Sequence, residues 1–277
     1  MNTVVTRLLR RNRAGRLGVL IVAAIMLIAE FGPLLAPYGP LSPDYPAARQ
    51  APTLGHLGGT DDFGRDILSR TLYGARISLG VGFAGVLLGL IPGVAAGLTA
   101  GYYSGGIDAF VMRVVDVMLA FPGILLAIAM VAILGAGIQN VVIAIGIFGF
   151  PVYTRIVRGS TLQATGQTYV EAAHAEGARP WRILMQHILP NIFAPIIVIS
   201  SLQIANAILT EAALSFLGLG APPPTPEWGA ILSGAENDLV TSPYMAVLPG
   251  AALVITILGF NLLGDGLRDA LDPRMRV

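Results

Sequence analysis

Residues 77–100 read ISLGVGFAGVLLGLIPGVAAGLTA, without one charged side chain. A helix needs about 20 mostly apolar residues to cross a hydrocarbon core of about 30 Å, so this stretch is long enough to span a membrane. Five other stretches have the same character, although the first of them contains Glu30. The sequence therefore predicts an all-α membrane protein with six transmembrane helices, at residues 17–35, 77–100, 117–134, 138–154, 188–210 and 245–264.

The composition of the whole chain supports this class. Of its 277 residues, 55% are hydrophobic and 12% are charged, and the mean hydropathy is +0.73. Soluble domains carry about 25% charged residues, roughly twice this share. A soluble enzyme, a nucleic-acid-binding protein and a disordered chain are therefore excluded as classes.

Two residue types are absent from the chain. Without cysteine there can be no disulfide, no zinc–thiolate site and no thiol catalysis. All 17 basic residues are arginine, whereas a P-loop needs a lysine to reach the β- and γ-phosphates of ATP. If ATP drives the work of this protein, another polypeptide binds it.

The placement of the arginines predicts the orientation, because cytoplasmic segments of membrane proteins are enriched in positive charge. With the N-terminus inside, the inner segments hold thirteen arginines: Arg7, Arg10, Arg11, Arg13, Arg16, Arg113, Arg155, Arg158, Arg179, Arg182, Arg268, Arg274 and Arg276. The outer segments hold four: Arg49, Arg65, Arg70 and Arg76. We predict an N-in, C-in topology. The first apolar stretch exceeds the roughly 7–15 residues of a signal peptide, so we expect it to be retained.

The chain divides into three parts at its long loops. Residues 1–36 form a cytoplasmic N-terminus and the first helix, residues 37–76 an outer loop, and residues 77–277 a core of five helices with an inner loop at 155–187. The outer loop starts with a proline-rich run. Its last part places Ile67, Leu68, Thr71, Leu72 and Ala75 on one helical face, which predicts an amphipathic helix at the outer interface, ahead of the second span.

The inner loop contains the most informative motif, which we call the elbow (residues 169–190). Residues 169–176 are expected to form a short helix with Glu171 near its N-terminal end, where the helix dipole favours an anion. Gly177 is expected to turn the chain with positive φ. Pro180 suits the first turn of a second helix, which we expect to continue rigidly into the fifth span. Such an elbow can receive contact from a soluble partner.

The residues Glu171-Ala172-Ala173, Gly177 and Leu189-Pro190 resemble the EAA loop of permease subunits of ABC importers. The spacing matches the family pattern throughout, with His187 at a position where the general pattern has isoleucine. A histidine there is a feature of the peptide-importer branch, and residues 59–79 and 214–232 also resemble that branch. The resemblance covers nearly the whole chain and is closest to the "C-type" permease of dipeptide and oligopeptide importers.

This resemblance implies a type I ABC importer permease fold, in which the elbow carries the coupling helix. It implies a second, homologous permease across a central pathway, two ABC ATPase subunits that bind ATP and Mg²⁺, and an extracytoplasmic solute-binding protein. It also implies a location in the bacterial plasma membrane, with the lipid bilayer as surroundings and no nucleic acid as partner. The residues expected to couple the permease to the ATPases are Glu171, Ala172, Ala173, Gly177, Leu189 and Pro190.

Four polar residues of the fifth span recur at helical spacing and share one face: Ser200, Gln203, Asn206 and Thr210. Polar groups at membrane depth face protein or water rather than lipid. The stripe therefore either lines a translocation pathway or forms hydrogen bonds between helices, and the sequence favours neither. Glu211, just beyond the stripe, is expected to pair with an outer-loop arginine or to help gate the pathway.

Three smaller groups of residues are interpreted structurally. Asp108, Arg113 and Asp116 are expected to form an ion-pair network at the membrane boundary. Trp228, after the proline run at 222–226, is interpreted as an anchor at the outer interface in preference to a contact with the binding protein. His174 and His187 lie too far apart, without a third ligand nearby, to predict a metal site.

The function predicted from these features is transport, with no catalytic residue and no cofactor in this chain. The chain is expected to form half of the pathway of an ATP-driven importer of di- or oligopeptides, with nickel, glutathione or oligosaccharide as alternative substrates. A self-sufficient secondary transporter is a distant alternative, because the spans carry almost no charge and the inner loop would have no task. A membrane-embedded enzyme would need a convergent catalytic set that the spans do not contain.

Overall fold

The computed structural model describes residues 12–271, and within that range the elements are helices, with one isolated β-bridge between Thr60 and Asp66. In chain order they are α2 (Arg13–Leu35), η1 (Tyr45–Ala47), α3 (Ile67–Tyr103), α4 (Gly105–Leu119), α5 (Gly123–Leu134), α6 (Ile138–Thr165), α7 (Thr168–Ala175), α8 (Pro180–Arg182), the π-helical η2 (Ile183–Ile188), α9 (Phe193–Phe216), α10 (Trp228–Ala235), η3 (Glu236–Asp238) and α11 (Tyr244–Leu271). The arginines at 7, 10, 11, 274 and 276, used to predict the orientation, lie outside the described residues.

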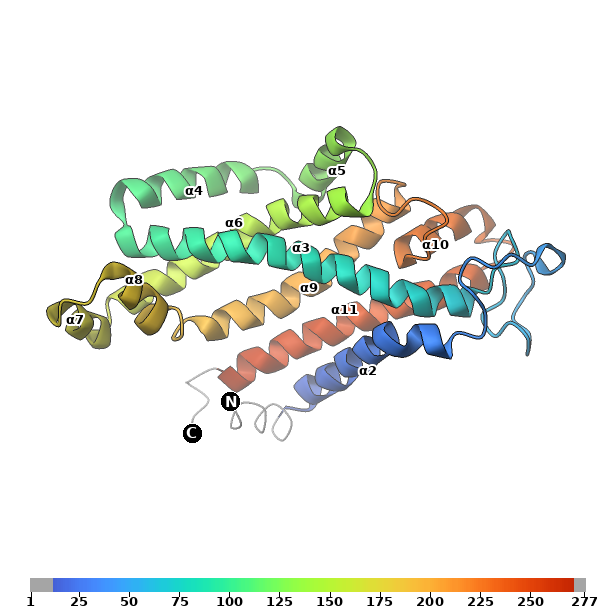
Figure 1. The fold of residues 1–277 in the computed structure, drawn as a ribbon, viewed down its shortest axis with the longest axis horizontal. Helices are drawn as coiled ribbons and strands as arrows, with labels where there is room; N and C mark the ends of the chain where they lie inside the picture. The colour runs from blue at the N-terminus through green and yellow to red at the C-terminus, as the bar shows by residue number, and fades with distance from the viewer. Residues whose placement is uncertain (1–11, 272–277) are drawn as a thin grey trace.

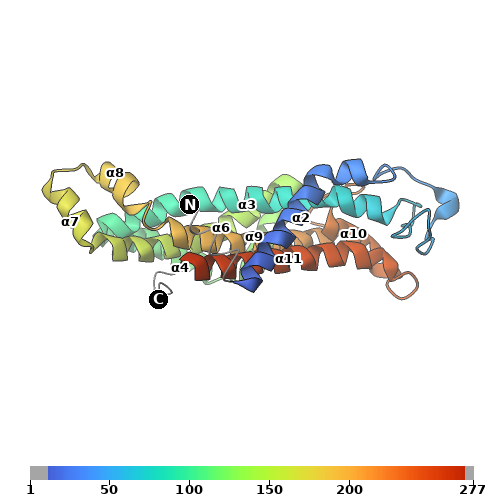
Figure 2. The same cartoon turned by 90° about the horizontal axis from the view of Figure 1, so that it is seen from below.

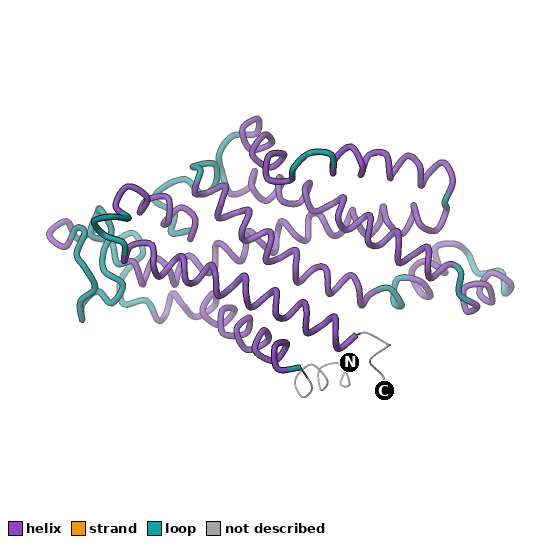
Figure 3. Tube along the Cα trace, turned by 180° about the vertical axis from the view of Figure 1, so that it is seen from behind, coloured by secondary structure: helices purple, strands orange, loops and turns teal. Residues whose placement is uncertain are grey.

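The long helices run side by side along the molecule, as Figure 1 shows for α3, α6, α9 and α11, with α2 against α11. Helices α7 and α8 stand at one end of this bundle, and the 37–76 loop and α10 lie at the other (Figures 1 and 2). Seen from behind in Figure 3, most loops gather at these two ends. Asn12 donates a 2.7 Å hydrogen bond to Asp269, so the start of α2 and the end of α11 meet toward the elbow's side.

Helices α3 and α6 are in close contact because α3 presents a glycine at every fourth position. Gly85, Gly89, Gly93, Gly97 and Gly101 are all buried against α6. A Cβ atom at Gly97 would lie 2.7 Å from the Cβ of Val157, and one at Gly93 would lie 2.6 Å from the Cβ of Tyr153. Small residues spaced in this way let two membrane helices approach closely, so this face sets the distance between α3 and α6.

Five helices are long and apolar enough to cross a membrane, namely α2, α3, α6, α9 and α11. The predicted third span at 117–134 is wrong as a single straight helix. Its residues are divided between α4 and α5, which meet at an angle of 87°. Proline disfavours helical conformation at the residue before it, and Pro122 interrupts the segment with an extended ψ of 125°. Helix α5, with 12 residues, is about 18 Å long, too short to cross about 30 Å alone.

Several helices extend beyond the predicted apolar limits. Residues 67–76, expected as a separate amphipathic helix at the interface, are the first turns of α3, and Asp66 caps that helix by accepting from the backbone N–H of Ser69 at 2.7 Å. Helix α3 has 37 residues and is therefore about 55 Å long. This exceeds the hydrocarbon thickness, so α3 is long enough to extend past the membrane region. Most of the added length, residues 67–76, lies at the end opposite the elbow, whereas Leu98, near the other end of α3, packs against the elbow.

Candidate coupling elbow and polar stripe

The first helix of the elbow has the expected form. Helix α7 runs from Thr168 to Ala175, with Glu171 in its first turn. Gly177 follows with φ +74°. Its N–H donates to the carbonyl of His174 at 3.0 Å, and the N–H of Ala178 donates to the carbonyl of Ala173 at the same distance. These two bonds are the Schellman arrangement that ends a helix with a left-handed residue. No atom lies within 4 Å of the place a Cβ at Gly177 would take, so the backbone angle alone requires glycine.

Helix α7 has one buried face and one exposed face. Ala173 is buried with Val170, whereas Glu171 and Ala172 are exposed. The buried face belongs to a hydrophobic cluster that includes Leu98 of α3, Val157 and Ala164 of α6, and Ile183, Leu184 and Ile188 of η2. The elbow therefore rests on α3 and α6, and Glu171 and Ala172 are presented to solvent at the end of the bundle.

The second half of the elbow differs from the prediction of one rigid helix leading into the fifth span. Pro180 is the first residue of α8, as expected, but α8 passes into the π-helix η2 and the helix then breaks over residues 189–192. Pro190 has no N–H to continue the helical ladder. The side chain of Asn191 instead donates to the carbonyl of His187 at 2.7 Å. Leu189 and Pro190 thus form a joint between the elbow and α9.

A cavity of about 550 Å³ lies beside the turn of the elbow, and Trp181 on its wall is 69% exposed. Its lining consists of Glu176, Gly177, Ala178, Arg179, Trp181, Arg182 and His187. An exposed tryptophan beside two arginines is common where a protein surface binds a partner.

The two histidines of this region have separate surroundings. His174 stacks on Tyr102, at the end of α3, with ring centroids 5.9 Å apart, and its Nε2 lies 3.4 Å from the tyrosine hydroxyl. His187 lies on η2, beside the cavity. Within residues 12–271, no three His, Asp or Glu side chains gather as they would around a metal ion. The Tyr102 contact was not predicted, because its partners are 72 residues apart.

The four residues of the polar stripe share one face of α9, toward α6. Gln203, Asn206 and Thr210 border a small hollow together with Phe148 and Tyr153 of α6. The amide of Asn206 donates to Gln203 at 3.3 Å, and the Thr210 hydroxyl donates to the Asn206 carbonyl at 2.8 Å.

One member of the stripe bonds to another helix. Ser200 accepts a 3.3 Å hydrogen bond from the hydroxyl of Tyr153 and donates at 2.7 Å to the carbonyl of Ile196. The helix-packing interpretation thus fits Ser200, whereas in the described chain the side-chain hydrogen bonds of Asn206 and Thr210 remain within α9, and Asn206 is exposed.

Among residues 12–271, Glu211 does not make the predicted pair with an outer-loop arginine, and Trp228 is placed differently from its prediction. Glu211 is 2% exposed and, within the described chain, makes no ion pair with an arginine. Trp228 is 1% exposed and donates from its indole N–H to the carbonyl of Thr71 at 2.9 Å, so it is an internal packing residue and the interfacial-anchor interpretation is wrong. Helix α10 packs against α9 and α11 and also contacts α3, which buries the indole.

The acidic residues of α4 pair with arginines of α6. Arg158 holds Asp108 with two guanidinium nitrogens, one of them at 2.6 Å from Oδ2, and Arg155 lies 2.6 Å from Asp116. Arg113, predicted as their partner, makes no ion pair among the residues that the structure describes. Sequence proximity suggested the wrong partner, because α4 lies against α6.

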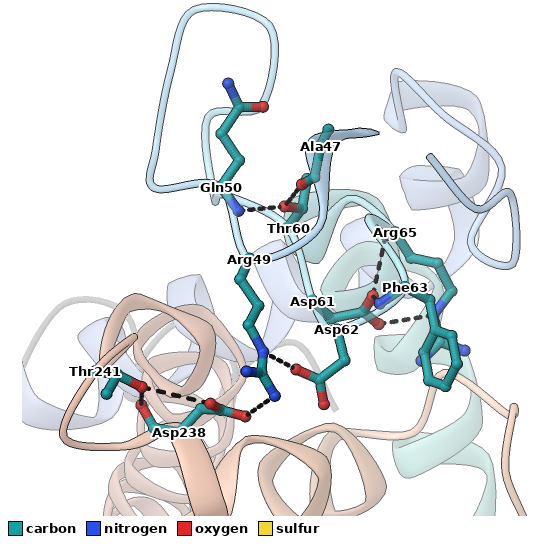
Figure 4. Close-up of polar contacts among 10 residues, drawn as sticks. All are labelled: Ala47, Arg49, Gln50, Thr60, Asp61, Asp62, Phe63, Arg65, Asp238 and Thr241. Atoms are coloured by element: carbon teal, nitrogen blue, oxygen red, sulfur yellow. Dashed lines mark hydrogen bonds and ion pairs between the residues drawn. The ribbon is translucent and has the colours of Figure 1, made fainter. Parts of the chain in front are cut away.

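A polar network at the opposite end of the bundle was not predicted. Figure 4 shows Arg49 between Asp62 at 2.7 Å and Asp238 at 3.2 Å, which joins the 37–76 loop to the segment before α11. The hydrogen bond to Asp62, and then the charges of Asp62 and Asp238, raise the pKa of Arg49 above its ordinary value. Asp61 binds Arg65 at 2.7 Å beside this pair.

Comparison with known families and proteins extends these observations. Residues 93–277 match the model of the family described as binding-protein-dependent transport system inner membrane component. Residues 4–52 match the N-terminal TM domain of oligopeptide transport permease C.

Two curated relatives cover most of the chain. One is the glutathione transport system permease protein GsiD of Pectobacterium atrosepticum, 49% identical over 98% of this chain and 90% of that protein. Another is the dipeptide transport system permease protein DppC of Alkalihalophilus pseudofirmus, 47% identical over 97% of this chain and 88% of that protein.

The fold is similar to a chain in an inward-facing crystal structure of the MetNI methionine ABC transporter. The TM-score is 0.61 at 19% identity, with 73% of this chain and 97% of that chain covered. This likeness concerns the fold, and it agrees with the expected type I ABC importer permease architecture.

Proposed function

This chain belongs to the inner membrane components of binding-protein-dependent transport systems, and from that membership we propose that it forms half of the pathway of an ATP-driven importer of short peptides. The relatives named for glutathione and for dipeptides support this substrate class, because glutathione is itself a tripeptide. A small peptide is therefore preferred over nickel or an oligosaccharide.

The elbow is the observation that carries the proposal. It exposes Glu171 and Ala172 on a helix that is capped by Gly177 and anchored on α3 and α6 through a hydrophobic cluster. A soluble partner that moves this helix therefore acts on the bundle directly. We assign the elbow to contact with an ABC ATPase subunit, which binds the ATP and Mg²⁺ that this lysine-free chain has no P-loop to hold.

The break in the helix at residues 189–192 changes which helices would receive motion from the elbow first. Force on the elbow is delivered first to α3 and α6, which contribute to its hydrophobic cluster, while the turn at Leu189 and Pro190 lets α9 change its angle. Hinges of this kind absorb backbone rotation over a few residues. We therefore assign Leu189 and Pro190 to a hinge, and Glu171, Ala172 and Gly177 to the contact itself.

The pathway is proposed to run along the exposed part of the polar stripe. Asn206 and Thr210 offer an amide and a hydroxyl on the face of α9 that the described chain leaves partly open. A second, homologous permease on that side would enclose the pathway. Peptide backbones need donors and acceptors of both kinds, and a neutral polar surface accommodates varied side chains.

The proposed orientation places the elbow and both chain ends in the cytoplasm of a bacterial cell. The hydrogen bond between Asn12 and Asp269 supports the same side for the start of α2 and the end of α11. Six crossings satisfy this arrangement if α4 and α5 together count as one bent span. The solute-binding protein would then approach the end formed by the 37–76 loop and α10.

The test uses this chain purified in complex with its second permease and ATPase subunits, together with the solute-binding protein. Dipeptide or glutathione, added with the binding protein, should stimulate ATP hydrolysis and enter proteoliposomes that contain ATP. Stimulation by Ni²⁺ without any peptide would reassign the substrate. Transport in the absence of ATPase subunits would remove the importer assignment in favour of a secondary transporter.

A further inference from the structure

The N-terminus of α10 is capped by a fully buried carboxylate. Glu227 is 0% exposed, and its oxygens accept from the backbone N–H groups of Gly229 at 2.6 Å and Ala230 at 2.9 Å. The hydroxyl of Ser78, on α3, donates to the same side chain at 3.1 Å. Three donors and the positive end of a helix dipole together stabilise the ionised form of a carboxyl group.

A second buried carboxyl group lies on α9, where the start of α10 packs closely against that helix. Glu211 is 2% exposed, and a Cβ at Gly229, two residues after Glu227, would lie 2.7 Å from the Cα of Ala212, the residue after Glu211. Its Oε1 accepts only a long 3.5 Å hydrogen bond from Ser215, and its Oε2 is completely buried without a partner in the described chain. The other groups near the pair, Ser78 on α3 and Ser215 on α9, are uncharged.

Two adjacent carboxylates cannot both remain ionised in an enclosed space without a cation. Each buried charge loses its hydration, and the two charges repel each other. No arginine or histidine in residues 12–271 lies within ion-pair distance of either group. We propose that Glu211 carries a proton, and that Glu211 and Glu227 form a buried protonation site that joins α9 to the start of α10.

The proton accounts for the orphaned oxygen of Glu211, because a protonated carboxyl group has an O–H to donate and Glu227 has lone pairs left to accept it. The protonation site links α9, the helix that follows Leu189 and Pro190, to α10 at the end of the bundle opposite the elbow. This inference does not depend on which solute is transported.

The proposal predicts that the packing of α10 on α9 depends on pH, because Glu211 holds its proton more tightly when it is buried than when water reaches it. While the pair is buried, Glu211 keeps its proton; once α9 and α10 separate and water enters, Glu211 ionises readily. Rising pH therefore favours separation of α9 from α10, and falling pH favours the joined state.

Infrared spectroscopy tests the proposal on the complex in lipid nanodiscs, with glutamate ¹³C-labelled at the side-chain carboxyl. At neutral pH, the wild-type spectrum should contain a protonated-carboxyl band that shifts in D₂O and is lost in Glu211→Gln. Glu30→Gln is the matched control, because Glu30 is an exposed glutamate of another membrane helix, α2. The band lost in Glu211→Gln should remain in Glu30→Gln.

Thermal unfolding gives a second measurement. Glutamine can donate as a protonated acid does, so Glu211→Gln should assemble and unfold close to the wild-type temperature at neutral pH, whereas Glu211→Ala should unfold at a lower temperature. From mildly acidic to alkaline pH, the wild type should lose stability relative to Glu211→Gln.

Three results would overturn the site. One is the absence of a band that Glu211→Gln removes. Another is a Glu211→Gln protein that fails to assemble or unfolds like Glu211→Ala, which would mean that the charge of Glu211 is needed. The third is stabilisation of the wild type but not of Glu211→Gln by Na⁺ or Mg²⁺, which would place a metal cation between the two groups.

Discussion

Arg158 of α6 binds Asp108 of α4 through two guanidinium nitrogens, across 50 residues of sequence. Both side chains are partly buried, at 29% and 18% exposed, and the forked geometry restricts the angle between the helices. Together with the pair of Arg155 and Asp116, this bond fastens α4 to α6 up to the bend that follows α4. The part of the third span that is free of ionic contacts is α5.

Removing this bond should loosen α4. We expect Asp108→Ala to lower the free energy of unfolding by about 1–3 kcal/mol, because it leaves a charged donor group without its partner. Thermal unfolding of the purified complex measures the effect. Arg113→Ala is the control, since Arg113 lies on the same helix, is exposed and makes no ion pair in the described chain. Equal effects of the two variants would contradict the fastening role.

The glycine face of α3 should not tolerate side chains. We expect Gly93→Leu to destabilise the chain by about 1–3 kcal/mol or more through overpacking, because even a Cβ there meets Tyr153 at 2.6 Å and the carbonyl of Phe150 at 3.0 Å. Gly80→Leu is the matched change on the same helix, where no atom lies within 4 Å. Yield and unfolding temperature of the two proteins should differ clearly; similar values would refute the close-contact argument.

The turn of the elbow should depend on backbone conformation rather than on space. Gly177→Val should cost about 1–2 kcal/mol locally and change the direction of Glu171, which lowers both uptake and substrate-stimulated ATP hydrolysis. Gly177→Asn should be milder, because asparagine adopts positive φ more readily. Normal coupling in Gly177→Val would exclude the turn from the transmission of force.

Glu171→Arg tests the contact surface itself. The side chain is exposed, so the change should leave folding and membrane insertion intact while reducing ATPase binding and uptake together. Subunit stoichiometry of the purified complex, measured beside ATP hydrolysis and uptake, separates loss of binding from loss of coupling. Full uptake with an arginine at this position would contradict the assignment.

Orientation can be measured directly, because the chain has no native cysteine. A single cysteine at Ala175 should react with impermeant reagents only from the cytoplasmic side, and one at Gly55 only from outside. Both positions are exposed, so a negative result is not due to burial. Labelling of Ala175 from outside would invert the proposed topology.

The two interpretations of the polar stripe predict different effects of substitutions on transport and on stability. Asn206→Leu should slow transport without preventing assembly, because Asn206 is exposed and its side chain bonds only within α9 in the described chain. Tyr153→Phe removes the bond to Ser200 between α6 and α9, so it should lower the unfolding temperature while the side chains of Asn206 and Thr210 are retained. Failure of Asn206→Leu to assemble with the second permease would favour helix packing at Asn206.

Much of the elbow was predictable because its signals are local. Gly177 has the positive φ that a helix end requires, and Pro180 begins the next helix, each within a few residues of the motif that suggested it. The continuous second helix was not a correct expectation. A π-helical segment and the side-chain bond of Asn191 intervene, and these depend on how η2 packs against α3 and α6.

The sequence by itself determined the membrane class, the positions of five long apolar helices and the family, because apolar length and motif spacing can be read along the chain. Only the tertiary structure decided that Arg158 and not Arg113 binds Asp108, that Trp228 is buried against α3, and that Glu211 lies where the start of α10 packs on α9. Each of these contacts joins different helices. Spacing within one helix states which residues share a face, but the neighbour of that face is set by the packing of the whole bundle.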